Sequence, residues 1–296
     1  LKIRINVKKN MKQENLVKVH SLILLIRSKN MFKIALGILI VVVLTIFFLP
    51  IFYTISPFEL NPTKILQAPS FEHLFGTDRL GRDVLARVLE GGQTSLIIGF
   101  LAASISSLVG LFIGITAGFL KGNVDRAITI IIDLFLTFPT FFLLLALVSY
   151  IQASSIILII VISITSWMGM SRMIRSESFA ISNKPYIKIL KISNISNFKI
   201  VFKYFAPLLA PIFLISFTFG VGGAILAESG LSFLGLGINP PNMSWGSLLS
   251  DGKAVIDIAW WVSFFPGFMI FVITFCLIQI SDYLQNLANK KEIINY

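Results

Sequence analysis

The sequence has few charged residues and a single cysteine. Charged residues make up 13% of the 296 positions, about half of the roughly 25% that soluble domains carry. Hydrophobic residues make up 56% and come in long runs. Cys276 lies inside one of these runs, so no disulfide can form within the chain. The composition excludes an ordinary soluble domain.

Groups that carry chemistry are also scarce. No G-x-x-x-x-G-K-[ST] phosphate loop occurs. The two histidines, His20 and His73, lack the spacing of metal ligands. We therefore expect no catalytic, metal or cofactor site in this chain, which argues against a membrane enzyme. Energy for uphill transport would have to come from an ion gradient or from a partner.

The long hydrophobic runs predict an all-α integral membrane protein. A hydrocarbon core roughly 30 Å thick requires about 20 apolar residues per helix. The first run is followed by no small-residue cleavage site and is too long for a signal-peptide core, so we expect it to be retained. The second and fifth are rich in Gly, Ala and Ser, which let membrane helices approach closely, so these two should lie inside the bundle. The six predicted spans are 33–53, 94–118, 127–150, 155–173, 206–227 and 262–282.

The distribution of basic residues predicts the orientation. The net charge is +11, but the Lys and Arg residues lie between the apolar runs rather than on one aromatic-rich face, so we expect no nucleic acid partner. With the N-terminus inside, the inner segments hold 20 Lys and Arg residues and the outer segments 54–93 and 228–261 hold five. Basic residues favour the cytoplasmic side. We expect both termini in the cytoplasm and a multi-pass protein of the cell membrane.

Asp133 is the main ionisable residue within a predicted span. Such residues often mark ion pathways, so one interpretation is a proton relay. The other is an interhelical hydrogen bond or an ion pair with Arg126 or Arg172. A single carboxylate near the end of a span gives little support to a gradient-driven carrier.

The basic loop 172–205 contains a predicted amphipathic helix. Pro185 suits a first helical turn, with Ser182 and Asn183 before it as possible caps. Helical spacing gives the segment two faces. The basic face consists of Lys184, Lys188 and Lys191. The other face consists of Tyr186, Ile189, Leu190 and Ser193. The helix would either lie on anionic lipid or dock into a groove of a cytoplasmic partner.

The outer segment 228–261 is rich in glycine and partly apolar. Non-helical backbone near membrane depth is tolerated only against protein or a water-filled cavity. We therefore expect either a re-entrant, gate-like segment or an ordinary ordered extracellular loop. The residues assigned to this gate region are Glu228, Gly230, Phe233, Gly235 and Gly237.

Four blocks in order resemble a known family. The chain is similar to the second permease subunit of the dipeptide/oligopeptide/nickel branch of ATP-binding-cassette importers. The resemblance covers about two thirds of the chain, from residue 71 to the sixth span. The blocks are FGTDRLGRDVLARV at 75–88, Asp133 with Phe138-Pro139, the segment 166–175, and 228–267 with its Pro-Pro, Ser-Trp-Gly and Phe-Pro-Gly sequences.

The family signature lies in the loop between the fourth and fifth helices. It has an E-A-A triplet, a Gly soon after, and a Pro thirteen residues beyond the Gly. Aligned from Pro207, this chain has Asn194 at the Gly position and the sequence Lys-Ile-Leu at the triplet. The resemblance implies a coupling helix that seats in a cleft of a cytoplasmic ATPase. The coupling residues would be Lys184, Pro185, Tyr186, Ile187, Lys188, Ile189, Leu190, Lys191, Asn194, Ser196 and Pro207.

The resemblance implies a type I ABC importer permease fold and an assembly. The partners would be a homologous second permease subunit, two cytoplasmic ATPase subunits that bind ATP and Mg, and an extracellular solute-binding protein. The cargo would be peptides, nickel or metal chelates. We divide the chain into 1–93 (basic tail, first helix and extracellular segment), the transmembrane domain 94–287 and a cytoplasmic tail 288–296. The alternative is a gradient-driven secondary transporter or channel.

Overall fold

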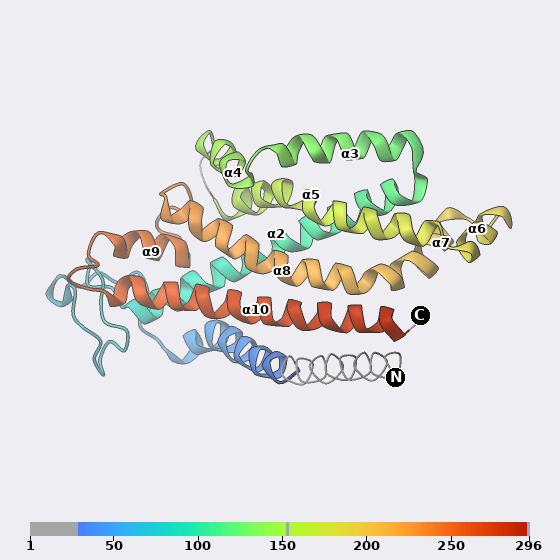
Figure 1. Cartoon of the computed structure of the whole chain (residues 1–296). Coiled ribbons are helices and arrows are strands. Elements are labelled where there is room, and N and C mark those ends of the chain that lie inside the picture. Colours follow the sequence, from blue (N-terminus) through green and yellow to red (C-terminus); the bar gives the residue numbers. More distant parts are fainter. Residues whose placement is uncertain (1–28, 152–153, 295–296) are drawn as a thin grey trace, which may run out of the picture.

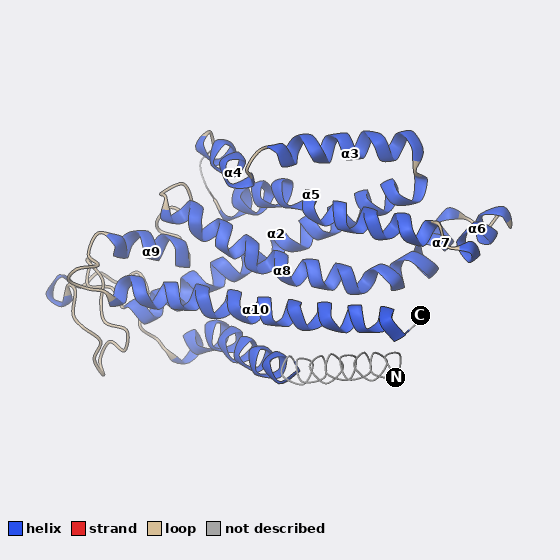
Figure 2. Ribbon diagram, viewed as in Figure 1, coloured by secondary structure: helices blue, strands red, loops and turns tan. Residues whose placement is uncertain are grey.

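The structure is a computed structural model that describes residues 29–151 and 154–294. This part of the chain is helical and contains no strand longer than an isolated bridge. Residues 1–28, 152–153 and 295–296 lie outside this part, and the first of these ranges contains most of the predicted basic tail. The elements are an N-terminal helix Lys29–Phe52, the 3-10 turn Pro62–Lys64, α2 Val84–Leu120, α3 Gly122–Thr137, α4 Thr140–Ser149, α5 Ser155–Ser182, α6 Pro185–Ile192, α7 Asn197–Ile200, a π-helical turn Val201–Phe205, α8 Ala206–Phe233, α9 Trp245–Lys253 and α10 Trp261–Ile294 (Figures 1 and 2).

The predicted spans are found, with one correction. Within the described residues, five helices are long and apolar enough to cross a membrane: the N-terminal helix, α2, α5, the continuous run Asn197–Phe233, and α10. The third predicted span, 127–150, is not one straight helix. It is divided into α3 and α4, whose axes differ by 80°. The break follows from Pro139, because a proline disfavours helical backbone in the preceding residue, and Phe138 is extended, with ψ 133°.

α2 and α8 occupy the middle of the bundle, as their small residues predicted. In Figure 1 they lie between α3 and α5 on one side and α10 and the N-terminal helix on the other. Three glycines of α2 face α5 so closely that no side chain would fit. A Cβ at Gly114 would lie 2.7 Å from the Ser171 carbonyl oxygen, and one at Gly118 would lie 2.7 Å from that of Arg175. Backbone contact therefore joins α2 and α5.

Contacts between neighbouring helices define one level across the bundle. The hydroxyl group of Ser281 in α10 donates a hydrogen bond to the Ile215 carbonyl oxygen of α8 (3.2 Å). The next residue of α8, Ser216, lies with its hydroxyl 3.7 Å from the Met173 sulfur of α5. Residues 281, 215 and 173 therefore lie at about the same height along the bundle.

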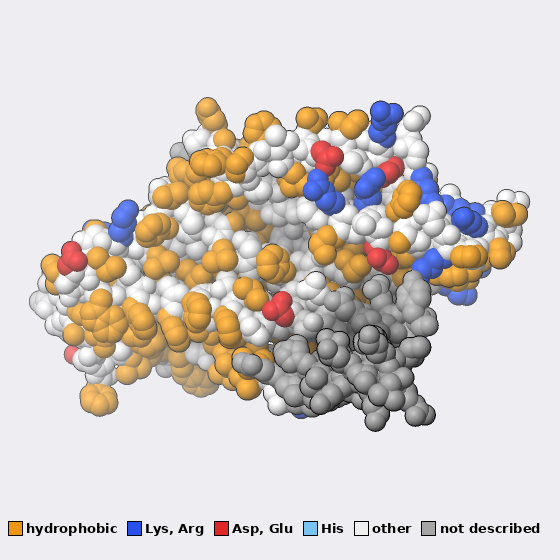
Figure 3. All heavy atoms as spheres, in the orientation of Figure 1, with side chains coloured by type: hydrophobic (Ala, Val, Ile, Leu, Met, Phe, Trp, Pro, Cys, Tyr) orange, Lys and Arg blue, Asp and Glu red, His pale blue; other side chains and the backbone are white. Residues whose placement is uncertain are grey.

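Charged side chains gather from this level onward. Arg172 of α5 pairs with Asp133 of α3, Asp282 follows directly in α10, and Tyr283 stacks on Phe32 beside Lys33. On the face shown in Figure 3, hydrophobic side chains cover the middle of the molecule, and charged ones lie toward its two ends, with most of them toward α6. Because charged groups avoid the hydrocarbon core, this level marks one boundary of the bilayer. We call the part beyond it the α6 end and the opposite part the α9 end.

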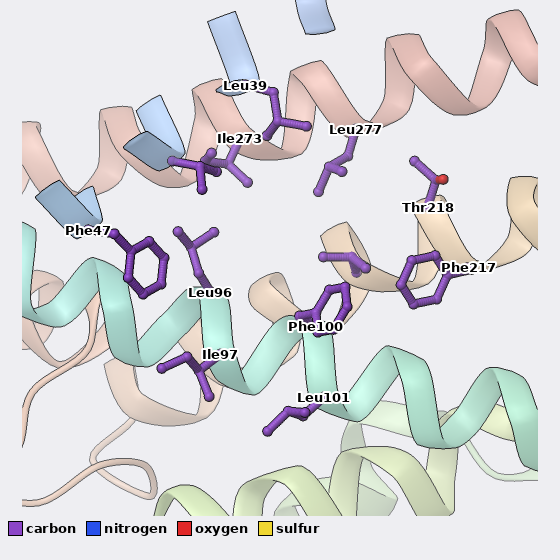
Figure 4. A pocket seen from close by; sticks show the side chains of 12 residues that line it. Leu39, Phe47, Leu96, Ile97, Phe100, Leu101, Phe217, Thr218, Ile273 and Leu277 are labelled. Atoms are coloured by element: carbon purple, nitrogen blue, oxygen red, sulfur yellow. The ribbon is translucent and has the colours of Figure 1, made fainter. Parts of the chain in front are cut away.

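An apolar groove of about 460 Å³ lies between the N-terminal helix, α2, α8 and α10 (Figure 4). Leu39, Phe100 and Leu277 are among its lining residues, and Thr218 is the one with a polar side chain. The Thr218 hydroxyl donates to the Leu214 carbonyl oxygen of its own helix (2.8 Å). The groove lies among membrane spans and offers no free polar group to a polar solute, so we assign it no part in recognition.

Candidate functional site

α6 begins where the sequence predicts, but its caps differ from the prediction. Pro185 is in the first turn, and Lys184 is the N-cap with no side-chain hydrogen bond. Ser182 is buried in the last turn of α5. Asn183 follows as the C-cap of α5, and its Oδ1 accepts a hydrogen bond from Lys121 Nζ (2.8 Å). Both residues therefore close α5 rather than cap α6, which corrects the prediction.

Asn194 allows α6 to end sharply. Its φ is 56°, in the left-handed region, and the Ile195 N–H donates to the Leu190 carbonyl oxygen (3.4 Å). A left-handed residue followed by this bond is the usual helix ending at which Gly is preferred and Asn is the common substitute. The residue type at the signature Gly has changed, yet the backbone conformation that a glycine serves is present.

The apolar side chains of α6 point in two directions. Ile187 is completely buried and packs in a cluster with Phe205, Ile200 and Ile181, and Leu190 is half-buried against the same cluster. Ile189 and Ile192 are 61% and 82% exposed. The predicted apolar face is therefore wrong at Leu190, which helps to hold α6 on the bundle. The exposed large side chains of α6, α7 and the π-helical turn, which we call the α6 apolar surface, are Tyr186, Ile189, Ile192, Phe198 and Phe202.

Of the three lysines of α6, Lys191 also contacts the bundle. Lys191 Nζ lies 3.8 Å from the centre of the Phe119 ring and donates to the Phe119 carbonyl oxygen (3.2 Å). Burial lowers the pKa of Lys191, and the positive charge of Lys121 lowers it further. All three lysines, Lys184, Lys188 and Lys191, are exposed. Lys191 is thus also a contact between α6 and the last turns of α2, which the spacing of the lysines did not predict.

The remaining residues predicted to take part in coupling lie where the chain returns from α6 to α8. Ser196 is the N-cap of α7, and its Oγ accepts from the Lys199 N–H (3.4 Å). The π-helical turn follows, and Pro207 lies in the first turn of α8. Pro207 suits a first helical turn, because proline has no N–H that would need a partner there. The π-helical turn before it is of a kind that is frequent at functional sites. This segment connects α6 directly to a membrane span.

Asp133 is engaged in an ion pair, as the second of the two interpretations predicts. Its partner is Arg172 of α5, and both side chains are more than half exposed. Arg175, one turn further along α5, pairs with Asp125 of α3, with Arg175 Nη2 2.8 Å from Asp125 Oδ2. The two pairs join α3 to α5. No further ionisable group of the described residues extends them into a relay through the bundle.

At the α9 end, the gate region is helical in its first half. α8 continues through Glu228 and Gly230 to Phe233, so the expectation of a non-helical segment is wrong there. A turn then follows, with Gly235 at φ 81°. A Cβ on Gly237 would collide with Ser232, so the turn after α8 depends on glycine at that position.

Glu228 is fully buried in a cluster of hydroxyl groups. Its carboxylate accepts hydrogen bonds from Ser232 Oγ (2.7 Å) and from Ser95 Oγ of α2 (3.1 Å). Ser95 Oγ in turn accepts from the Trp245 N–H (3.1 Å) at the start of α9. The Trp245 indole N–H donates to the Val88 carbonyl oxygen of α2 (3.0 Å). Glu228 therefore connects α8 to α2, and Ser95 connects both to the start of α9.

The α9 end also carries a charged network that sequence reasoning missed. Asp78 accepts from Arg82 Nε (2.7 Å) and from Arg87 Nη1 (2.6 Å). Arg87 Nη2 donates to Asp251 Oδ2 of α9 (3.0 Å). Burial raises the pKa of Asp251, although the charges of Arg82 and Arg79 oppose this shift. The signal in the sequence was the density of Arg and Asp at 78–87 in a chain otherwise poor in charge.

Comparison with known proteins identifies the family and several relatives of this chain. The sequence model of the family described as "Binding-protein-dependent transport system inner membrane component" matches residues 110–291. An oligopeptide transport system permease protein of Haemophilus influenzae is 32% identical over 265 residues, which cover 88% of this chain and 85% of that protein. Two dipeptide transport system permease proteins, from Alkalihalophilus pseudofirmus and Bacillus subtilis, are 35% and 34% identical, covering 89% and 82% of this chain and 88% and 79% of the relatives.

A solved structure shares the fold. A chain of the MetNI methionine ABC transporter in an inward-facing conformation has a TM-score of 0.52 and 15% identity to this chain. The likeness covers 68% of this chain and 96% of that one. At this identity the likeness concerns the architecture of the helices.

Proposed function

This chain belongs to the family of binding-protein-dependent inner membrane transport components and is a permease subunit of an ATP-binding-cassette importer, and we propose that this importer carries peptides. We also propose that α6 couples the chain to the ATPase subunits. Each importer would hold this chain, a homologous second permease subunit, two ATPase subunits and an extracellular solute-binding protein. The relatives are named for oligopeptide and dipeptide transport. This favours peptides over the nickel and metal-chelate cargoes that the resemblance also implied. The family match also replaces the gradient-driven alternative.

The observation that carries the coupling proposal is the α6 apolar surface. Exposed apolar patches on a folded protein usually mark a surface that a partner covers. The last nine residues of α5, after Met173, carry the chain about 14 Å beyond the bilayer boundary, at 1.5 Å per residue. α6 follows directly and is held by the buried Ile187. This position supports a protein partner over a lipid surface, and coupling to ATPase subunits would place the α6 end in the cytoplasm.

The direction of coupling follows from how α6 is held. α6 packs on the ends of α5 and α8 through Ile187 and contacts α2 through Lys191. A displacement of α6 by closing ATPase subunits would therefore act on three membrane spans. Glu228 and the hydroxyl groups around it would hold the gate region closed until α2 and α8 move apart.

The test is co-purification of the ATPase subunits with variants of this chain. Ile189→Asp combined with Ile192→Asp places two charges on the α6 apolar surface without touching the buried cluster. Burying unpaired charges in a contact is strongly unfavourable, so we expect the ATPase subunits to be lost. Lys188→Gln, on the same helix and exposed, is the control and should assemble normally. Undiminished assembly of the double variant would remove α6 from the interface.

A further inference from the structure

An open cavity of about 880 Å³ with charged side chains in its lining lies at the α9 end. It is lined by residues of the segment 58–87, the turn after α8, the helix α9 and Val262 of α10. Three arginines and two aspartates are among its lining residues: Arg79, Arg82, Arg87, Asp78 and Asp251. The cavity lies on the side of the membrane opposite α6, where cargo would arrive if the α6 end is cytoplasmic.

The two aspartates are already neutralised by two of the arginines. Asp78 accepts from both Arg82 and Arg87. Asp251 accepts from Arg87 (3.0 Å), and Arg82 Nη2 lies 3.8 Å away from it. Arg82 and Arg87 are thereby fixed in place by carboxylates on two different segments of the chain.

Arg79 is the arginine of the cavity lining that pairs with neither aspartate. It is exposed, and within residues 29–151 and 154–294 it makes no hydrogen bond or ion pair, acting on Asp251 only through its charge. Three cations and two anions leave the cavity with one surplus positive charge, and the guanidinium of Arg79 is the exposed group that carries it.

We infer that this cavity binds the terminal carboxylate of the cargo peptide and that Arg79 is the residue that holds it. This inference rests on the proposed function for peptides. A peptide with neutral side chains is a zwitterion with a single carboxylate, and this group is the one complementary to the unpaired Arg79. The planar guanidinium binds a carboxylate through two parallel hydrogen bonds, and the fixed pairs of Arg82 and Arg87 keep the rest of the cavity rigid.

The test compares a peptide acid with its amide in the complete importer. The importer, with both permease subunits, its ATPase subunits and its binding protein, is reconstituted in vesicles, and uptake of trialanine and of trialanine amide is measured at concentrations that saturate the binding protein. Arg79→Gln should lower uptake of the acid by about tenfold, the effect of one charged hydrogen bond, and leave uptake of the amide unchanged. Arg79→Lys keeps the charge and should recover part of the loss. The control Lys253→Gln removes a charge at the same end but outside the cavity lining, and should leave both uptakes unchanged.

Each outcome separates this inference from the proposed function. An acid-to-amide ratio that Arg79→Gln does not change would overturn the inference. Equal loss of both peptides would also overturn it, since that result places Arg79 in a contact with a carboxylate of the binding protein. A wild-type importer that carries neither peptide would contradict the proposed function itself.

Discussion

Lys191 of α6 holds the last turns of α2 through Phe119. Its ammonium group lies 3.8 Å from the centre of the Phe119 ring and 3.2 Å from the Phe119 carbonyl oxygen. A cation near the C-terminal end of a helix is favoured by the helix dipole, and the ring adds a cation–π contact. The pair therefore helps to hold α6 against α2, a contact that the spacing of the lysines did not predict.

Replacing Lys191 should therefore loosen α6. We expect Lys191→Gln to raise the rate of proteolytic cleavage within 185–196 several-fold in the purified protein, because the contact of α6 with α2 is lost. Lys188→Gln, three residues away and exposed, should leave the rate unchanged. Equal rates for the two variants would show that Phe119 does not hold the helix.

Asn194 should tolerate glycine and resist a β-branched residue. A left-handed backbone costs an ordinary residue about 1–2 kcal/mol, and a β-branched side chain fits it worst. Asn194→Val should weaken binding of the ATPase subunits by about tenfold, the equivalent of 1.4 kcal/mol, if that strain displaces α6. Asn194→Gly should bind as the wild type does. The measurement is the equilibrium affinity of the ATPase subunits for each variant. Equal affinities of Asn194→Val and the wild type would show that the conformation of this residue does not set the position of α6.

The backbone contact between α2 and α5 should not accept even a methyl group. In Gly114→Ala the new Cβ would lie 2.7 Å from the Ser171 carbonyl oxygen, and overpacking of this kind costs about 1–3 kcal/mol. We expect a lower thermal unfolding temperature in detergent. The control is Gly169→Ala in α5, where a Cβ would meet nothing within 4 Å. That variant should be as stable as the wild type or slightly more stable.

The orientation is tested by labelling intact cells with a membrane-impermeant thiol reagent. Asn242→Cys at the α9 end should react, and Lys188→Cys in α6 should react only after the cells are opened. Both positions are exposed, and the native Cys276 is buried, so it should contribute little background. The reverse pattern would invert the topology and exclude α6 as a cytoplasmic coupling helix.

Purified alone, the chain should neither bind nor hydrolyse ATP, because its sequence has no phosphate loop. Addition of the ATPase subunits should give hydrolysis. Nucleotide binding to the isolated chain, measured by calorimetry, would contradict the assignment of ATP to the partners.

Hydrophobic runs predicted the spans because each run must satisfy its backbone within one helix. The hydrophobic pattern alone does not show the 80° break at Phe138, since apolar residues continue on both sides of it. The signal in the sequence was Pro139, which the prediction of a single span 127–150 did not use. The direction of Leu190 was also out of reach. Whether an apolar residue of an amphipathic helix faces the bundle or a partner depends on the tertiary contacts, here the cluster around Ile187.

The charged cavity was missed for a related reason. Asp78 and Arg87 are close in sequence, but Asp251 lies 164 positions from Arg87, and no local pattern predicts their meeting. Glu228 was chosen for its place in a glycine-rich block. Its actual surroundings come from Ser95 on α2 and Ser232 on α8, two spans that the sequence placed in the bundle without giving their register.

α2 is one unbroken helix of 37 residues that reaches both ends of the molecule. Its closest approach to α5 is at Gly110, Gly114 and Gly118, near the α6 end. From Gly114 the helix extends about 9 Å to Leu120 and about 45 Å to Val84, at 1.5 Å per residue. A tilt about this contact has a short arm at Phe119, where Lys191 is attached, and a long arm at the charged cavity. If a partner displaces α6, as proposed, a tilt of α2 about this contact would produce a movement about five times larger at the charged cavity.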